Sequence, residues 1–427
     1  MLDEATGPLS IHTMKTLLLP LLATMPLLAA ETQPTPDPLL ATDGTRIVTP
    51  ELWWKKRKPE LLELFTREMY GRSPEKPREM TFEVFDRDTN VLGGKATRIQ
   101  IDIRPAGPAG PRMDLLVYVP NKRGGPVPAI LGLNFWGNQV IHPDPGIRIT
   151  ESWVENNRQR YTDLSGVADH RATEATRGVN ASQWPVETIL DRGYALATMY
   201  REDVAADHEP YFKSGAQATF PDLQKGDDNF GTIAAWAWSL SRALDALEQQ
   251  PMIDPKRVAA FGFSRLGKAA LWAGATDPRF AMVISNESGA GGAKLFRRGS
   301  GESIERLNMH FPHWFARNFH RYNGKDKELP FDQHLVIALI APRPVYVASA
   351  LEDLHSDPEG EFAGAKAAEP VYHLLGADGL PCDTWPKPGV SVQGGIGYHV
   401  REGKHDVLDF DWKCYLDFAD KHLGKNR

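Results

Sequence analysis

The segment 258–270, which reads VAAFGFSRLGKAA, is the feature that most constrains the fold of this chain. A short apolar run leads into Gly262, Phe263 and Ser264, and small, helix-forming residues follow directly. This order predicts a strand, a sharp turn and a helix, with Ser264 at the apex of the turn. The helix start would place free backbone N–H groups and the positive end of its dipole beside the hydroxyl. Ser264 is therefore a candidate nucleophile.

The turn departs from the common Gly-x-Ser-x-Gly pattern. Leu266 follows Arg265, and glycine returns only at Gly267. Taken alone, Gly-x-Ser also occurs in ordinary turns, so the three letters are a weak signal. The strand before Ser264 and the helix after it favour a nucleophile elbow over an ordinary turn.

Composition places the chain among soluble globular proteins. The 427 residues are 41% hydrophobic and 24% charged, and this length allows one large α/β domain or two smaller ones. The net charge of −6 argues against a nucleic-acid partner, which usually needs a basic face. The eleven tryptophans suggest a carbohydrate ligand, although most tryptophans lie in protein cores.

The N-terminal segment carries a targeting signal. Residues 14–30 resemble a secretory signal peptide with cleavage near Ala30, whereas residues 1–13 fit poorly as a charged leader, and Met14 is an alternative start. Prolines interrupt the apolar run, which disfavours a membrane-spanning helix, and no other apolar run reaches spanning length. We therefore expect an exported protein, periplasmic or secreted, without a membrane span in the mature chain.

Two further regions follow the signal. Residues 31–44 are rich in proline and predict a flexible lead-in, and residues 45–427 predict a single domain. Cys382 and Cys414 are the cysteines of the chain. Export permits a disulfide between them, but two free buried thiols fit the sequence equally well.

Strand-like apolar runs alternate with helix-like segments along the domain. Near-continuous apolar strands separated by helices predict an α/β fold, a mostly parallel central sheet with helices on both faces in a three-layer sandwich. Such sheets place functional residues at the carboxyl ends of strands. The expected strands are 115–119, 128–134, 194–199, 258–263, 280–285 and 344–349, and the expected helices include 233–248 and 412–422.

A serine nucleophile needs a base that takes its proton and an acid that orients the base. Two late histidines compete for the role of base. His405 lies in a loop just before the last expected helix, and His399 lies in a segment that alternates like a strand. We prefer His405, because the base of such a site is expected after the last strand.

Two carboxylates can serve as the acid. Glu287 follows the strand expected next after that of Ser264, and Asp353 follows the strand after that one. Either can reach the histidine if the loops allow, although a carboxylate at a strand end is also commonly a helix cap. The order nucleophile, acid, histidine matches that of α/β-hydrolases.

At this point the residues resemble a known family. The segment 262–268 resembles the Gly-Cys-Ser-Arg-x-Gly-Lys signature of glucuronoyl esterases, carbohydrate esterase family 15, with Phe263 in place of the cysteine. The resemblance covers most of the mature chain, and the lack of extra cysteine pairs is similar to the bacterial branch. It implies that residues 45–427 are one α/β-hydrolase catalytic domain. The other matching segments are 131–138, 231–238, 286–292 and 403–406.

The resemblance also implies roles for the catalytic residues. Ser264 would be the nucleophile and His405 the base. Glu287 matches the family's acid in an unusual earlier position, and Asp353 matches the second acidic position of bacterial members. The backbone N–H and the guanidinium of Arg265 would face the oxyanion, where a fixed cation suits the developing negative charge.

Substrate-binding residues are implied in the same way. Lys268 matches a residue that binds hydroxyls of the uronate sugar. His355 stands where the family often has a tryptophan that lines the sugar pocket, which affects the expected substrate preference. Glu302, Glu305 and Trp314 lie in the corresponding loop and are further candidates, without individual roles.

The resemblance therefore implies a serine esterase that cleaves the ester between 4-O-methyl-glucuronate groups of xylan and lignin alcohols. We expect a monomer that acts on glucuronoxylan or lignin–carbohydrate esters. We expect no cofactor and no metal, because no His/Cys cluster has the spacing of zinc ligands. The alternatives are another carbohydrate esterase (acetyl xylan or feruloyl esterase), a peptidase, or a uronate- or xylan-binding protein without turnover.

Overall fold

The computed structural model describes residues 34–156 and 164–424, so the expected signal peptide at 14–30 lies outside the described residues. The chain from Pro34 onward forms one compact unit. Residues 34–44 were expected to be part of a flexible lead-in, but hydrogen bonds hold them against the domain. Arg297 Nη1 donates to the Pro34 carbonyl at 2.9 Å, and Arg57 Nε donates to the Pro38 carbonyl at 3.1 Å.

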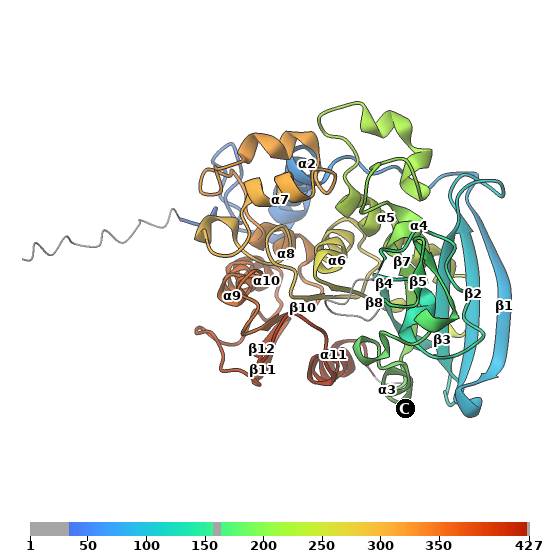
Figure 1. Cartoon of the computed structure of the whole chain (residues 1–427). Helices are drawn as coiled ribbons and strands as arrows, with labels where there is room; N and C mark the ends of the chain where they lie inside the picture. The colour runs from blue at the N-terminus through green and yellow to red at the C-terminus, as the bar shows by residue number, and fades with distance from the viewer. Residues whose placement is uncertain (1–33, 157–163, 425–427) are drawn as a thin grey trace, which may run out of the picture. The chain divides into compact units, whose positions relative to one another are not determined.

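A ten-stranded sheet crosses the whole unit (Figure 1). Its strand order is β1-β2-β3-β7-β4-β8-β9-β10-β12-β11. The strands from β7 to β12 in this order run parallel, which confirms the expected mostly parallel sheet. The parallel strands are β7 (Ala195–Tyr200), β4 (Val127–Asn134), β8 (Ile253–Phe263), β9 (Met282–Asn286), β10 (Val345–Ala350) and β12 (Ile396–Arg401).

Antiparallel strands extend both sides of the parallel part. The expected strand 115–119 is part of β3, which pairs antiparallel with β7 and so does not join the parallel strands. β1 and β2, which had no predicted counterpart, continue this antiparallel extension. The antiparallel strands are β1 (Thr81–Val91), β2 (Ala96–Arg104), β3 (Met113–Pro120) and, at the other edge, β11 (Ser391–Gln393).

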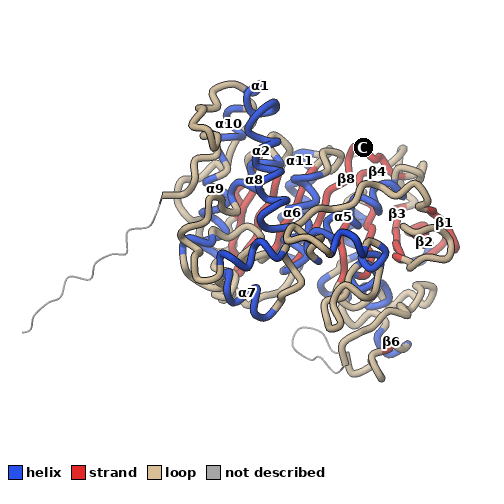
Figure 2. The backbone as a smooth tube through the Cα atoms, turned by 90° about the horizontal axis from the view of Figure 1, so that it is seen from above, coloured by secondary structure: helices blue, strands red, loops and turns tan. Residues whose placement is uncertain are grey.

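Helices cover both faces of the sheet and make the three layers (Figure 1). On β8, Val258 and Ala260 pack into the core on one face, while Ala259 and Phe261 pack into the core on the other. The first core contains residues of α5 (Thr232–Leu247), α6 (Arg265–Thr276) and α8 (His334–Ile340), which lie over the strands when viewed from above (Figure 2). The second core contains residues of α3 (Val186–Asp191) and α11 (Asp409–His422).

Shorter elements complete the described chain. They include the helices α1 (Pro50–Leu52), α2 (Lys58–Phe65), α4 (Arg201–Val204), α7 (Ile304–His310), α9 (Pro358–Ala367) and α10 (Glu369–Leu374), and the small hairpin of β5 (Val167–Ala168) and β6 (Arg171–Ala172). Within the described ranges, no helix is both long and apolar enough to cross a membrane. Both cysteines are free thiols, Cys414 buried and Cys382 half-buried.

The serine turn is a strained junction between β8 and α6. Ser264 has φ +57°, a left-handed conformation that is costly for a residue with a side chain. A Cβ atom at Gly262 would lie 2.0 Å from the Leu266 carbonyl oxygen, and one at Gly267 would lie 2.9 Å from Ser288 Cβ. Gly262 is therefore needed because the first turn of α6 passes close to the end of β8, and Gly267 because α6 passes close to the loop after β9. Leu266, which takes the place of the usual glycine, is buried in the core.

We predict that Gly262→Ala destabilises the fold by roughly 3 kcal/mol or more, because the added methyl group meets backbone that cannot move alone. Gly125→Ala is the matched control, since no described atom lies within 4 Å of its Cβ position. We expect this control to change stability by less than about 0.5 kcal/mol. Thermal and denaturant unfolding measure both effects, and equal stability of the two variants would contradict the steric account of the turn.

Candidate active site

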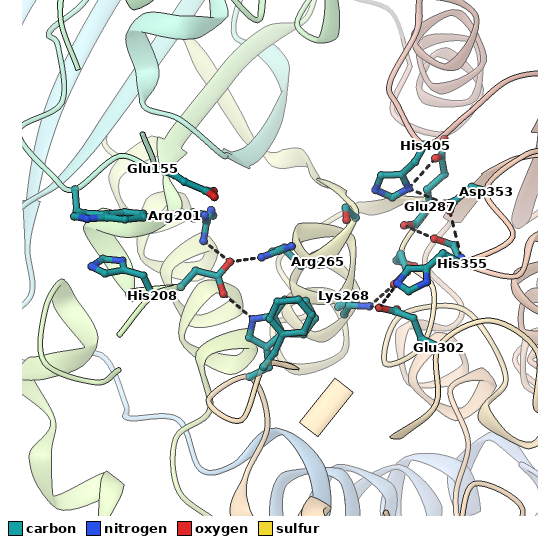
Figure 3. Close-up of a pocket in the computed structure, with 17 residues that line it drawn as sticks. Glu155, Arg201, His208, Arg265, Lys268, Glu287, Glu302, Asp353, His355 and His405 are labelled. Atoms are coloured by element: carbon teal, nitrogen blue, oxygen red, sulfur yellow. Dashed lines mark hydrogen bonds and ion pairs between the residues drawn. The ribbon is translucent and has the colours of Figure 1, made fainter. Parts of the chain in front are cut away.

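A pocket of about 380 Å³ lies where the parallel strands end. The loops after β7, β8, β9, β10 and β12 each contribute to its lining, as the expected strand-end placement requires. Figure 3 shows the two sides of this pocket, with Arg265 between them. The lining includes the expected residues Ser264, Arg265, Lys268, Glu287, Glu302, Trp314, Asp353, His355 and His405.

The imidazole of His405 lies between the two candidate acids. Its Nδ1 is 2.6 Å from Asp353 Oδ2 and 3.1 Å from Glu287 Oε2 (Figure 3). The ring of Phe263, which directly precedes Ser264, packs against the imidazole with 4.6 Å between the ring centres. Because both carboxylates contact Nδ1, Nε2 is the nitrogen that can exchange a proton with Ser264 in the same pocket. The two acids thus converge on one histidine.

The two carboxylates differ in their surroundings. Arg401 Nη2 lies 2.6 Å from Glu287 Oε1, and the Asp406 N–H donates to Glu287 Oε2 at 3.2 Å. Burial raises the pKa of Glu287 to about 7, although His405 and Arg401 act in the opposite direction. Burial also acts to raise the pKa of Asp353, but the hydrogen bond with His405 outweighs it and holds that pKa below its usual value. Asp353 is therefore the more persistent anion beside His405.

The carboxylates make His405 a stronger base than a free imidazole. Burial acts to lower its pKa, but the hydrogen bonds to Asp353 and Glu287 outweigh this effect and raise the pKa to about 9. At neutral pH the ring is an imidazolium paired with the two acids. It must lose one proton before it can accept another from a serine hydroxyl.

His399, the alternative base, is a buried structural residue on β12. Its Nε2 lies 2.8 Å from Asp411 Oδ1, and its Nδ1 lies 3.0 Å from the Tyr346 hydroxyl. Asp411 also pairs with Arg401 Nε at 2.9 Å. The geometry therefore favours His405 as the base, with His399 supporting the arginine behind Glu287.

Arg265 begins α6 directly after the serine. Its Nη1 pairs with Asp207, and its guanidinium lies 4.8 Å from the ring centre of Trp314 and 5.0 Å from that of Phe311. Because these two rings stack on each other, a cation at nearly equal distance from both centres lies beside the edge of the stack. Asp207 was not identified from the sequence, although it follows the expected strand 194–199 at the same sheet edge as the other site residues.

Lys268 is buried and is turned toward protein groups. Its Nζ donates to the carbonyls of Ser288 at 2.7 Å and Ala290 at 2.6 Å, and it lies 3.6 Å from Glu302 Oε2. These bonds tie α6 to the loop that carries Glu287. Burial lowers the pKa of Lys268. The third N–H of its ammonium group is left to face the Glu302 carboxylate.

Lys268, Glu302 and His355 form a connected group that we call the polar cluster (Figure 3). His355 Nε2 lies 2.8 Å from Glu302 Oε1, and the His355 side chain is 52% exposed. Burial acts to raise the pKa of Glu302, but Lys268 and His355 outweigh it and lower the pKa to about 2. The cluster thus presents a permanent carboxylate with a donor on each side.

The remaining two candidates from the sequence separate in the structure. Trp314 stacks on Phe311 with 3.7 Å between ring centres, and its indole N–H donates to Asp207 Oδ1 at 2.7 Å. Glu305 is exposed on α7 and lies outside the described lining of the pocket. Of the two, only Trp314 is brought to the site.

One geometric test bears on a metal ion. Ligand atoms of Glu287, Asp353 and His405 all lie within 4.8 Å of one another, which is close enough to suit a cation. Arg401 already neutralises Glu287, however, and both carboxylates contact the ring nitrogen of His405. The donor set suits a histidine held by acids better than a metal centre, and the expected absence of a metal stays a prediction.

The serine elbow, the mostly parallel three-layer sheet and the histidine after β12 define a protein of the α/β-hydrolase fold. Comparison with known proteins narrows this class. A family model described as "Glucuronyl esterase, fungi" matches residues 170–376. A 4-O-methyl-glucuronoyl methylesterase of Schizophyllum commune is 33% identical over 350 residues, which cover 80% of this chain and 73% of the relative.

Two solved bacterial structures match over nearly their whole length. One is a promiscuous esterase of carbohydrate esterase family 15 from a marine bacterial metagenome, 46% identical with a TM-score of 0.85, covering 91% of this chain and 97% of that one. The other, a glucuronoyl esterase from Solibacter usitatus, is 43% identical with a TM-score of 0.85, covering 91% and 98%. This chain belongs to carbohydrate esterase family 15, the glucuronoyl esterases, and is a carboxylic ester hydrolase.

We predict that kcat/KM for ester hydrolysis rises with pH and reaches half its maximum near the raised pKa of His405, about 9. The reason is that the base is active only when neutral, so raising its pKa moves the active range upward. Initial rates between about pH 6 and about pH 10 measure the profile. His373→Gln, which changes an exposed histidine outside the described pocket lining, should leave the midpoint unchanged, and a plateau already reached at neutral pH in the wild type would contradict the prediction.

Proposed function

We propose that this protein hydrolyses the ester between the carboxyl group of 4-O-methyl-glucuronate on xylan and an alcohol of lignin, through an acyl-enzyme on Ser264. The observation that carries the proposal is the position of His405, held by Asp353 and Glu287 in the same pocket as the elbow serine. The polar cluster beside it supports a sugar ligand. Relatives named as 4-O-methyl-glucuronoyl methylesterases support the choice of ester.

The proposed reaction has two halves. Ser264 attacks the ester carbonyl while His405 Nε2 takes the hydroxyl proton, and the carbonyl oxygen becomes an oxyanion. Collapse of this intermediate breaks the bond to the alcohol, which leaves with the proton from His405. Water then attacks the acyl-enzyme with His405 as base, and the products are the free uronic acid and Ser264 with its proton restored.

Arg265 stabilises the charge that develops in both halves. The ester substrate is neutral at the reacting carbon, so a cation there favours the transition state more than the bound substrate. The strained turn places Arg265 directly after the nucleophile, where its backbone N–H at the start of α6 is also a suitable donor. Both groups act on the oxygen that becomes negative.

The polar cluster recognises the sugar. Glu302 accepts hydrogen bonds from sugar hydroxyls, and His355, the most exposed member, both donates and accepts at the mouth of the pocket. An imidazole at position 355 contributes hydrogen bonds where a larger aromatic ring would contribute stacking area. This favours a hydroxylated sugar ring bound edge-on by polar groups.

We further propose that the enzyme acts outside the cytoplasm as a monomer. Residues 14–30 have the composition of a secretory signal peptide, and a polymeric plant cell-wall ester lies outside the cell. The mature enzyme then begins after the signal peptide, and we propose that residues 34–44 belong to the same domain as the expected 45–427.

We predict that the wild type hydrolyses methyl and benzyl glucuronate, and that Ser264→Ala lowers kcat by about 10³-fold or more. Ser214→Ala, at an exposed position outside the described pocket lining, is the matched control and should keep full activity. Product release by chromatography measures the rates. Acetylated xylan and methyl ferulate are the competing substrates.

Three results would contradict this assignment. Hydrolysis of acetyl or feruloyl esters without hydrolysis of glucuronate esters would indicate a different carbohydrate esterase. Full activity of Ser264→Ala would exclude Ser264 as the nucleophile. Equal binding of uronate-containing xylan fragments by the wild type and Ser264→Ala, with no turnover by either, would indicate a binding protein.

We predict that the two acids share the orientation of His405 unequally. Asp353→Asn should lower kcat by about 10²-fold and Glu287→Gln by about tenfold, and the double variant should lose more than either. The difference follows from the shorter contact of Asp353 and from the Arg401 partner that Glu287 already has. Thermal denaturation checks that both single variants remain folded. Equal and complete loss from each single change would show that the acids cannot substitute for each other.

A further inference from the structure

Asp207 is a buried carboxylate that joins three segments of the pocket. Its side chain is 1% exposed, and Oδ2 contacts Nη1 of Arg265 and, at 2.5 Å, Nη1 of Arg201. Oδ1 accepts hydrogen bonds from Trp314 Nε1 at 2.7 Å and from His313 Nε2 at 2.8 Å. The carboxylate therefore links the loop after α4, the start of α6 and the segment after α7.

The Asp207 carboxylate holds both the Arg265 guanidinium and the indole of the neighbouring Trp314. Trp314 and Phe311 stack with an angle of 4° between their planes, and the Arg265 guanidinium lies beside this stack, 4.8 Å from the centre of the Trp314 ring and 5.0 Å from that of Phe311. The indole N–H of Trp314 donates to Oδ1 of Asp207, while Oδ2 of the same carboxylate pairs with Arg265. An arginine side chain has many rotamers, and the ion pair with Asp207 restricts them before any substrate arrives.

The charges around Asp207 keep it ionised. Burial opposes ionisation, but Arg265 and Arg201 outweigh it, and with His313 they hold the pKa of Asp207 well below its usual range. Arg201 has a second partner in Glu202 at 2.9 Å, so Asp207 does not neutralise it alone. Asp207 engages Nη1 of the Arg265 guanidinium.

We propose that Asp207 is the positioning residue of the oxyanion arginine: it holds the Arg265 guanidinium where negative charge develops in the transition state. This inference rests on the proposed role of Arg265 in ester hydrolysis. A preorganised cation stabilises the transition state without reorganising during the reaction, whereas a mobile arginine must first be ordered. Asp207 acts through Arg265 and has no contact with the reacting atoms in this role.

A double-mutant cycle tests the proposal. Asp207→Asn keeps the size of the side chain and an acceptor for Trp314 but removes the charge that faces Arg265. We expect kcat to fall by roughly 10-fold to 100-fold with KM changed by less than about threefold, because only transition-state stabilisation is lost. In an Arg265→Ala background the same change should cost less than about twofold further.

Two controls separate positioning from a general disturbance. Asp222→Asn alters an exposed aspartate that pairs with Lys225, and it should leave kcat and KM unchanged. The loss caused by Asp207→Asn should be the same factor for methyl and benzyl glucuronate, since the oxyanion forms whichever alcohol leaves. A distorted pocket would instead change the discrimination between the two alcohols.

The outcomes are distinct. An equal loss from Asp207→Asn in the wild-type and Arg265→Ala backgrounds would overturn the proposal, because Asp207 would then act independently of the arginine. If Asp207→Asn does not fold, His313→Phe keeps an aromatic ring against Tyr211 and the Asp207 carboxylate but removes one donor to Oδ1. Its smaller loss, about threefold, should likewise vanish in the Arg265→Ala background, and its persistence there would overturn the proposal.

Failure of the proposed substrate gives a different signal. A wild type that hydrolyses neither glucuronate ester contradicts the proposed function directly. The cycle is then measured with whichever ester the wild type hydrolyses, because every ester passes through an oxyanion.

Discussion

The hydrogen-bond ladder of the parallel strands continues past their ends, and this continuation assembles the site. The Ser264 N–H donates to the Asn286 carbonyl at 2.9 Å, and the Glu287 N–H donates to the Ala348 carbonyl at 2.7 Å. The Leu351 N–H donates in turn to the Arg401 carbonyl at 2.8 Å. Because β8, β9, β10 and β12 are neighbours in this order, residues far apart in the chain are fixed side by side by backbone bonds alone. This register determines where the side chains of Ser264, Glu287 and Asp353 lie relative to one another.

Several acids are buried at the pocket, and their burial carries an electrostatic cost. Glu287, Asp353 and Glu361 lie close together, and burial raises the pKa of Glu361 to about 8. Glu361 accepts hydrogen bonds from the Ser349 hydroxyl at 2.7 Å and the Gly289 N–H at 2.9 Å, so it supports the loop that carries Glu287. A neutral Glu361 and the charged imidazole of His405 allow Asp353 to stay ionised, whereas Glu287, with a pKa of about 7, gains a proton near neutral pH. Burial raises the pKa of Glu287, and the hydrogen bonds to Asp353 and Glu287 raise that of His405, so the titrations of the two groups are coupled.

Much of this site could be predicted because its chemistry follows local rules. Strand, turn and helix propensities locate Ser264, and the positions just after strands locate Glu287 and Asp353. Asp207 escaped notice because its partners, Arg265 and Trp314, are 58 and 107 residues away, and no short spacing reports such contacts. β1 and β2 escaped notice for another reason. The exposed face of β1 is polar, so the strand lacks the apolar run that marks the buried strands.

The sequence correctly predicts that Lys268 lies at the pocket, but it does not predict which groups the side chain contacts. An ammonium group has three donors, and here two of them meet the carbonyls of Ser288 and Ala290. The charge that remains is directed at Glu302, which His355 contacts from the other side. A sugar hydroxyl in this part of the pocket would therefore meet Glu302 and His355 before the lysine. In this chain the lysine contributes mainly by keeping Glu302 ionised and by fastening the Glu287 loop to α6, so that one buried cation serves both the sugar side and the acid side of the pocket.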